Sequence, residues 1–216
     1  MEACGTGGPT CYLVGAAPSA ERVFPRESDF IIAADGGYCH LRRWGISPNL
    51  TIGDLDSLGC ALPEGALCRT FPAEKDETDM QLALDEGLAR GYRRFVLVGA
   101  EGGRLDHTLA NVQLLLRAAR RGAYAELRGS GWRGAAVCPE RPQLRLRGKG
   151  TVSVFACGEA RGVTIEGMRY ALQDGALYGD TPRGISNELD GEGVVKLKEG
   201  ALLCLWQEGI EENHRE

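Results

Sequence analysis

The first half of the chain alternates short apolar runs with segments of helical periodicity. The apolar runs are bounded by Gly, Pro or Asp, which is typical of buried parallel strands. In two other segments, apolar residues recur every three or four positions and predict amphipathic helices. This alternation predicts a parallel α/β sheet. The expected strands cover residues 11–16, 30–34, 50–52 and 95–99, and the helical patterns cover 80–88 and 109–119.

The pattern changes after about residue 122. Short alternating runs follow one another, separated by glycines or other turn formers, and no stretch keeps a helical period. Such a pattern predicts an antiparallel sandwich or a small barrel. We therefore expect an α/β domain over 1–125 and a β domain over 126–216. The clearest expected strands of the second domain cover residues 143–147, 151–156, 162–165, 194–198 and 201–206.

Charge and cysteine content narrow the class of protein. The 216 residues carry a net charge of -5 without any basic block, which argues against nucleic-acid binding and mildly favours a cationic small molecule. The N-terminus lacks the charged start of a signal peptide, and no apolar run is long enough to span a bilayer. The eight cysteines form no C-x-x-C pair, so we expect free, mostly buried thiols and a cytoplasmic protein without membrane contact.

Three acidic clusters lie at or close behind the expected strands of the first half. Ligands of open α/β sheets bind at the carboxyl ends of strands, and carboxylates there can hold a hard cation. Nearby cations would screen phosphate charge, and glycines would let backbone approach it. The clusters predict a magnesium–polyphosphate site in an enzyme that uses a nucleoside triphosphate. They comprise Asp54, Asp56 and Ser57; Lys75, Asp76, Thr78 and Asp79; and Gly103, Arg104, Asp106 and His107.

Each cluster also has a purely structural interpretation. The aspartates after residue 52 could simply favour a turn, and Asp76 could be the N-cap of the following helix. Asp106 could cap the next helix or bind metal, and a single histidine such as His107 is more often structural than catalytic. Asn111 would lie one turn beyond His107. A further segment, Asp35-Gly36-Gly37, ends a strand at the same edge but has the composition of an ordinary tight turn.

Taken together, these segments resemble the thiamine pyrophosphokinase (thiamine diphosphokinase) family. The resemblance covers nearly the whole chain, and the motifs follow the family's order. A single motif is only moderately specific, whereas the ordered set on an α/β-then-β chain is very specific. The motifs are Ala34-Asp35-Gly36-Gly37, Gly53-Asp54-Leu55-Asp56-Ser57, Lys75-Asp76-Glu77-Thr78-Asp79, Gly103-Arg104-Leu105-Asp106-His107 with Asn111, Gly167-Met168-Arg169-Tyr170 and Gly184-Ile185-Ser186-Asn187-Glu188.

The resemblance implies an α/β protein with an N-terminal three-layer parallel-sheet (Rossmann-like) catalytic domain and a C-terminal antiparallel β-sandwich that binds thiamine. It implies transfer of a pyrophosphoryl group from ATP to thiamine, with Mg²⁺ or a similar divalent cation, giving thiamine diphosphate and AMP. It also implies a homodimer whose active sites lie between the catalytic domain of one subunit and the sandwich of the other.

The resemblance also implies roles for individual residues. Asp54 and Asp56 would hold the metal, with Asp79 as a further ligand or a contact to thiamine. An aromatic partner for thiamine is expected as well. Tyr170 and Trp206 are most simply core residues, but Trp206 is our candidate for this partner. Asp106 completes the catalytic set; Lys75, Arg104 and His107 would face the triphosphate; Asp35, Gly36 and Gly37 would line the cleft; Ser57, Asp76, Thr78, Gly103 and Asn111 would lie at the nucleotide site; and Ser186 and Asn187 would contact thiamine.

Two other functions remain open from the residues alone. Paired aspartates also activate water, so a metal-dependent phosphohydrolase would release phosphate without an alcohol acceptor. A binding module for thiamine or a nucleotide would bind its ligand without turnover, and binding would survive replacement of Asp54 and Asp56. The presence of all three acidic clusters together with Lys75 and Arg104 disfavours the binding module.

Overall fold

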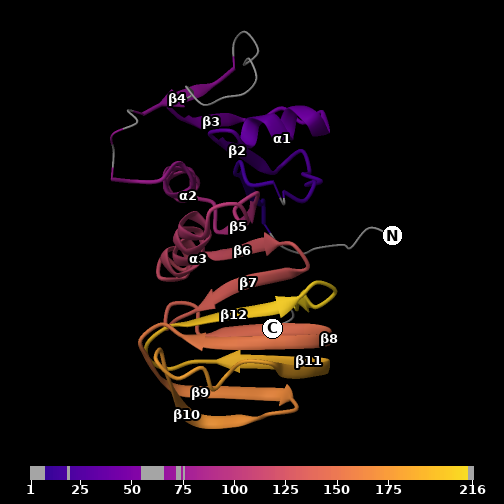
Figure 1. The fold of residues 1–216 in the computed structure, drawn as a ribbon, viewed down its shortest axis with the longest axis vertical. Coiled ribbons are helices and arrows are strands. Elements are labelled where there is room, and N and C mark those ends of the chain that lie inside the picture. The colour runs from indigo at the N-terminus through magenta and orange to yellow at the C-terminus, as the bar shows by residue number, and fades with distance from the viewer. Residues whose placement is uncertain (1–7, 19, 55–65, 72–73, 75, 214–216) are drawn as a thin grey trace. The chain divides into compact units, whose positions relative to one another are not determined.

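The structure, a computed structural model, describes residues 8–18, 20–54, 66–71, 74 and 76–213. The chain divides into two compact units, Met1–Thr108 and Leu109–Glu216. Helix α3 (Leu105–Ala119) begins in the first unit and continues into the second (Figure 1). The domain limits expected from the sequence, 1–125 and 126–216, stay a prediction.

The first unit is built on a parallel sheet. Its strand order is β5-β1-β2-β3-β4, and every neighbouring pair in this order is parallel. The four strands predicted for this half are confirmed. The additional strand, β4, has only three residues, which are half-buried or exposed, so it carries no apolar run that could predict it. The bounds are β1 Cys11–Val14, β2 Phe30–Ala34, β3 Leu50–Gly53, β4 Cys68–Thr70 and β5 Arg94–Val98.

Helices α1 (Gly37–Trp44) and α2 (Asp79–Ala89) cover opposite faces of this sheet. Val14 of β1 packs in one buried cluster with Leu41 of α1. Cys11 faces the other side, because side chains along a strand alternate between its faces. There α2 packs so closely that a Cβ on Gly87 would lie 3.1 Å from Cys11 Sγ. The first unit therefore has the predicted three layers.

Helix α1 is not predicted by the sequence pattern. Gly36 and Gly37 have the composition of a tight turn, and the only buried side chains of the helix are Tyr38 and Leu41. Its N-cap, Gly36, provides no side-chain hydrogen bond. Gly37 is required by packing, because a Cβ at this position would lie 1.8 Å from the Val14 carbonyl oxygen. The glycines therefore bring the start of α1 against the end of β1.

The second unit is antiparallel. Its strand order is β6-β7-β12-β8-β11-β9-β10, and β13 also pairs with β8. The two strands expected over 143–156 are a single long strand, β8, which continues through Gly148 and Gly150. Among the described residues after 122 there is no helix, as predicted. The bounds are β6 Tyr124–Gly129, β7 Trp132–Val137, β8 Gln143–Ala156, β9 Glu159–Met168, β10 Leu172–Tyr178, β11 Asn187–Lys196, β12 Leu202–Gln207 and β13 Glu211–Glu212.

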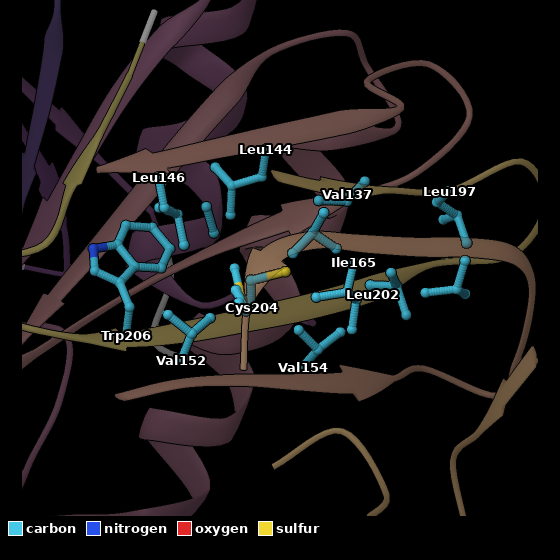
Figure 2. Close-up of a cluster of buried hydrophobic side chains, with 14 of the residues drawn as sticks. Val137, Leu144, Leu146, Val152, Val154, Ile165, Leu197, Leu202, Cys204 and Trp206 are labelled. Atoms are coloured by element: carbon cyan, nitrogen blue, oxygen red, sulfur yellow. The ribbon is translucent and has the colours of Figure 1, made fainter. Parts of the chain in front are cut away.

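The core of the second unit comes from alternating positions of these strands. Figure 2 shows side chains of β7, β8, β9 and β12 gathered in one cluster, with Trp206 close to Leu146 and Val152. Along β8 the pairing changes, because β12 pairs with 152–156 and β13 with Leu146 and Arg147. A strand that changes partners in this way joins the two layers of a sandwich. The predicted β-sandwich class is confirmed.

The expectation of free thiols is confirmed for Cys11, Cys68, Cys138, Cys157 and Cys204. It is wrong for Cys39, which is disulfide-bonded. Sequence spacing could not show this bond, because a disulfide depends on which segments the fold brings together. In the part of the chain that the structure describes, no helix is both long enough and apolar enough to cross a membrane.

Candidate functional site

The carboxyl ends of the parallel strands are joined by close backbone contacts at glycines. Gly15, directly after β1, donates its N–H to the Val98 carbonyl oxygen at 2.8 Å. A Cβ on Gly15 would lie 2.5 Å from the carbonyl oxygen of Gly99, which follows β5. Substituting either glycine would therefore separate the two loops. The edge thus presents closely packed backbone, as a site that binds polyphosphate needs.

His40 of α1 supports the same edge, and sequence reasoning did not find it. Its Nε2 lies 3.0 Å from the Ala17 carbonyl oxygen, so the tautomer protonated at Nε2 donates to the turn after β1. The imidazole also stacks on Trp44 with a centroid distance of 5.7 Å. Because α1 was not predicted, no sequence signal could direct His40 to this turn.

Asp35 and Asp54 follow the neighbouring strands β2 and β3. Asp35 has a left-handed backbone with φ of 45°, and its N–H donates to the Ile52 carbonyl oxygen at 2.7 Å. A Cβ on Gly53 would lie 3.2 Å from Asp35 Cα, so the two turns pack side by side. Asp35 and Asp54 are both half-buried. The carboxylates therefore share one edge of the sheet, where oxygen ligands suit Mg²⁺.

The complete metal set lies partly outside the described residues. Asp56 and Ser57 belong to the second motif but are not described. Within the described residues, no group of three or more His, Cys, Asp or Glu is placed to hold a metal ion. The donor types of Asp54 and Asp79 suit a hard cation. The ligand set Asp54, Asp56 and Asp79 stays a prediction.

The 75–79 motif lies at the start of α2. The N-cap is Thr78, whose hydroxyl oxygen accepts from the Gln81 N–H at 3.1 Å. The alternative N-cap, Asp76, is therefore wrong; it is exposed and lies two residues before the cap. Asp79 is the first residue of the helix and is half-buried. Capping thus accounts for Thr78, and Asp79 lies in the first turn, where a carboxylate also suits the helix dipole. Lys75 lies outside the described residues.

The 102–107 segment begins with left-handed glycines and leads into α3. Gly102 and Gly103 have φ of 96° and 76°, conformations that favour glycine. His107 is exposed, whereas Asn111 is buried, with only 8% of its surface exposed. The two residues are one turn apart on α3, but their side chains therefore do not share one environment.

Arg104 and Asp106 neutralise one another at this segment. Arg104 Nη2 donates to Asp106 Oδ2 at 2.6 Å, and Arg104 Nε donates to Oδ1 at 3.2 Å. The hydrogen bond from Arg104 holds the pKa of Asp106 at about 2, and the same pair raises the pKa of Arg104. Asp106 is therefore ionised at neutral pH and cannot donate a proton. Because both side chains are exposed, a polyphosphate could take over the guanidinium fork.

The second unit contains a separate cavity of about 490 Å³. It lies where the turn after β9 meets the segment before β11. Tyr170 presents an aromatic ring that is 58% exposed, and Ile185 is 44% exposed. The guanidinium of Arg169 lies 5.5 Å from the Tyr170 ring centroid and is paired with Glu188. The wall therefore combines an aromatic ring and apolar side chains with two arginines, Arg169, whose charge is balanced by Glu188, and Arg183.

Asn187 lines this cavity, whereas its neighbour Ser186 does not, and the two differ in exposure. Ser186 is exposed with a left-handed φ of 55°, and its N–H donates to Ser153 Oγ at 3.0 Å. Asn187 is only 4% exposed, and its amide bonds the Tyr170 backbone. A polar turn residue and a buried amide look alike in sequence, so the motif alone could not separate the two.

Trp206 is wrong as the aromatic partner of a ligand. Its side chain is 2% exposed within the sandwich core, and its Nε1 donates to the Ile210 carbonyl oxygen at 3.0 Å (Figure 2). Tyr170 is the aromatic residue that lines the cavity. The strand alternation around Trp206 does predict burial, whereas exposure of Tyr170 depends on the turn after β9.

The fold and these two sites define a two-domain protein with an acidic strand-end site on a parallel α/β unit and an aromatic cavity on a β-sandwich. Residues 23–127 match the family described as thiamin pyrophosphokinase, catalytic domain. Residues 141–202 match the family described as thiamin pyrophosphokinase, vitamin B1 binding domain. The chain therefore belongs to the thiamine pyrophosphokinase family.

A protein of similar sequence belongs to the same family. A thiamine pyrophosphokinase of Bacillus subtilis is 37% identical over 91 residues, which cover 40% of this chain and 42% of the relative. The chain is thus aligned with less than half the length of that relative.

Solved structures resemble the fold over most of its length. A thiamine pyrophosphokinase from B. subtilis has a TM-score of 0.80 at 26% identity, covering 92% of this chain and 98% of the other. One from Geobacillus thermodenitrificans has a TM-score of 0.77 at 27% identity, covering 92% and 97%. The yeast thiamin pyrophosphokinase, at 14% identity, shows the fold alone, with a TM-score of 0.68 over 94% and 88% of the two chains.

Proposed function

We propose that this protein transfers the pyrophosphoryl group of ATP to the hydroxyl of thiamine, giving thiamine diphosphate and AMP in the presence of Mg²⁺. The observation that carries the proposal is the match of both family domains, in order, to residues 23–127 and 141–202. The chemistry of the two sites supports it. Acids lie at the strand ends of the first unit, and an aromatic cavity lies in the second.

In this reaction the thiamine hydroxyl oxygen forms a bond to the β-phosphorus of ATP. The bond from that phosphorus to the oxygen bridging to the α-phosphate breaks, and AMP leaves with this oxygen and its electrons. The hydroxyl proton is released to water. The work of the protein is then positioning and charge neutralisation. Asp106 cannot supply a proton, because its pKa is held at about 2.

Asp54, Asp56 and Asp79 would hold Mg²⁺, which neutralises polyphosphate charge when it is bound. Lys75, Arg104 and His107 would contact phosphate oxygens. For Arg104 this requires exchange of its partner, because the guanidinium is paired with Asp106. The remaining proposed nucleotide contacts are Asp35, Gly36, Gly37, Ser57, Asp76, Thr78, Gly103 and Asn111.

Thiamine would bind at the cavity of the second unit. Its positively charged ring would lie against the exposed Tyr170 ring, where cation–π attraction and apolar contact act together. Ile185 adds apolar surface. Arg169 repels the cation little, because its charge is paired with Glu188. Arg183 also lines the cavity, and its positive charge opposes binding of a cation. Ser186 is exposed next to the lining residues Ile185 and Asn187, and we propose that it contacts thiamine directly.

We also propose a homodimer in the cytoplasm, with each active site shared between the α/β domain of one subunit and the sandwich of its partner. Mixing Asp54→Asn protein with Tyr170→Ala protein tests this arrangement. Subunit exchange would produce some sites without either substitution, so turnover at a thiamine concentration too low to support the Tyr170→Ala protein would rise above that of either variant alone. Confirmed exchange without any recovered activity would refute the shared site.

The test of the reaction is the nucleotide product formed from thiamine, ATP and Mg²⁺. AMP should appear one-for-one with thiamine diphosphate, and Asp54→Asn should abolish turnover while the thermal unfolding curve is retained. Phosphate release without thiamine would favour the phosphohydrolase instead. Full turnover by Asp54→Asn would remove that residue from the metal set, and Asp190→Asn, on the exposed surface of β11, serves as the matched control.

A further inference from the structure

Asn187 uses its side-chain amide to hold a backbone segment. Asn187 Oδ1 accepts from the Tyr170 N–H at 2.9 Å and from the Glu188 N–H at 2.9 Å. Asn187 Nδ2 donates to the Tyr170 carbonyl oxygen at 2.8 Å. Both acceptor positions and one of the two donor hydrogens of the amide are thus used inside the protein. With 4% of the residue exposed, Asn187 has little surface left for a ligand.

The segment that carries Asn187 is itself fixed against β8. The Gly184 carbonyl oxygen accepts from the Val154 N–H at 2.8 Å. A Cβ on Gly184 would lie 2.3 Å from the Val154 carbonyl oxygen, so the two backbones are in direct contact. The Ser186 N–H donates to Ser153 Oγ at 3.0 Å. Asn187 therefore extends from a rigid base.

Tyr170 lies on the other side of this amide, next to Arg169, whose N–H donates to the Glu188 carbonyl oxygen at 2.9 Å. Strand β9 ends at Met168 and β10 begins at Leu172, so Tyr170 is in the turn between them. Its ring is 58% exposed. The neighbouring ion pair between Arg169 and Glu188 links the same two segments, but its exposed side chains contribute little to rigidity. The Asn187 amide thus holds the backbone of Tyr170 itself, from which the exposed ring extends.

We propose that Asn187 is a positioning residue that sets the Tyr170 ring against the cationic ring of the substrate and does not itself contact the substrate. The inference rests on the proposed binding of thiamine at this cavity. It assigns Asn187 a role through Tyr170, because Asn187 borders the cavity with only 4% of its surface exposed and its amide is bonded to the Tyr170 backbone.

A double-mutant cycle on the full-length chain tests the inference, with thiamine binding measured by calorimetry. Asn187→Ala and Tyr170→Ala should each weaken binding by about tenfold, the scale expected for loss of a hydrogen-bonded or aromatic contact. If Asn187 acts through Tyr170, the double variant should bind no more weakly than Tyr170→Ala alone. A double variant weakened by about a hundredfold, the product of the two effects, would overturn the inference.

Two further variants separate positioning from a general effect on folding. Thr164→Val removes another side-chain bond to backbone in the same unit, from the Asp174 N–H at 3.2 Å, and should leave thiamine affinity unchanged. A loss of affinity in this control equal to that in Asn187→Ala would refute a specific role. If Asn187→Ala does not fold, Asn187→Asp replaces it, because its carboxylate keeps both acceptor bonds and exchanges the donor for an oxygen that repels the Tyr170 carbonyl oxygen.

Hydrogen exchange of the Tyr170 amide provides a readout that needs no ligand. The Tyr170 N–H donates to Asn187 Oδ1, so its exchange should accelerate by about tenfold or more in Asn187→Ala. Unchanged exchange would show that the Asn187 amide does not hold the Tyr170 backbone. If exchange accelerates but wild-type protein does not bind thiamine, the proposed function fails while the contact between Asn187 and Tyr170 stands.

Discussion

A buried carboxylate in the second unit provides a test of how electrostatics stabilises this fold. Glu126 of β6 is 5% exposed. Its Oε1 accepts from Arg128 Nε at 2.7 Å and from Arg133 Nη1 at 3.0 Å. Its Oε2 accepts from the Tyr124 hydroxyl at 2.9 Å. The replacement Glu126→Gln keeps the shape of the side chain and removes the charge that both guanidinium groups contact.

The expected cost follows from burial of the partners. The side chains of Arg128 and Arg133 are only 24% and 22% exposed, so water replaces the lost carboxylate incompletely. Hydrogen bonds to charged groups contribute about 1.5–3 kcal/mol each, and breaking a buried ion pair costs about 3–5 kcal/mol. We expect Glu126→Gln to lower the free energy of unfolding by about 3 kcal/mol. At about 2–4 °C per kcal/mol, Tm should fall by about 6–12 °C.

The effect should also depend on pH. Burial raises the pKa of Glu126, but Arg128, Arg133 and the Tyr124 hydroxyl together lower it by more. The net pKa of Glu126 therefore lies below its ordinary value of 4.5. A depressed folded-state pKa gives stability that is fully present above the unfolded-state pKa. That stability is lost as the pH falls through the folded-state pKa. The difference between wild type and Glu126→Gln should therefore be largest near neutral pH and shrink below about pH 4.

Urea unfolding at several pH values measures both expectations. Asp190→Asn is the control, because its ion pair with Lys149 is exposed by 77% and 79% at the two side chains and should contribute negligibly. A Glu126→Gln variant as stable as wild type at pH 7 would refute the argument from burial. A difference that stays constant down to pH 3 would show that the charge of Glu126 is not its source.

Two other predictions address packing. Trp206→Phe should lower the free energy of unfolding by about 1–3 kcal/mol, because it removes buried volume and the bond to the Ile210 carbonyl oxygen. Calorimetry should show unchanged thiamine affinity. Weakened binding at full stability would instead place Trp206 at the ligand site. Gly37→Ala should unfold at least about 10 °C below wild type in a thermal scan, because its Cβ would lie 1.8 Å from the Val14 carbonyl oxygen. The control Gly8→Ala, whose Cβ meets nothing within 4 Å, should unfold at the wild-type temperature. Equal Tm values for the two variants would contradict the packing at α1.

The sequence by itself determined which apolar runs form strands in the α/β half, apart from β4, and which acidic residues follow them. Apolar runs identify buried strands because both faces of a parallel sheet are covered, and the carboxyl ends of such strands collect the polar residues. The position of Asp54 beyond β3 was therefore predictable. The change to antiparallel structure was also visible, because alternation and frequent turn formers leave no helical period.

Only the tertiary structure decided which residues of each motif are available to a ligand. Helix α1 has just Tyr38 and Leu41 as buried side chains, and its start is set by contact of Gly37 with Val14, a contact distant in sequence. Thr78 rather than Asp76 caps α2 because the first helical turn begins at Asp79. Burial of Asn187 and exposure of Tyr170 follow from the meeting of two turns, 17 residues apart, at one amide. Local sequence encodes residue type and periodicity, whereas exposure and hydrogen-bond partners depend on segments that meet only in the folded chain.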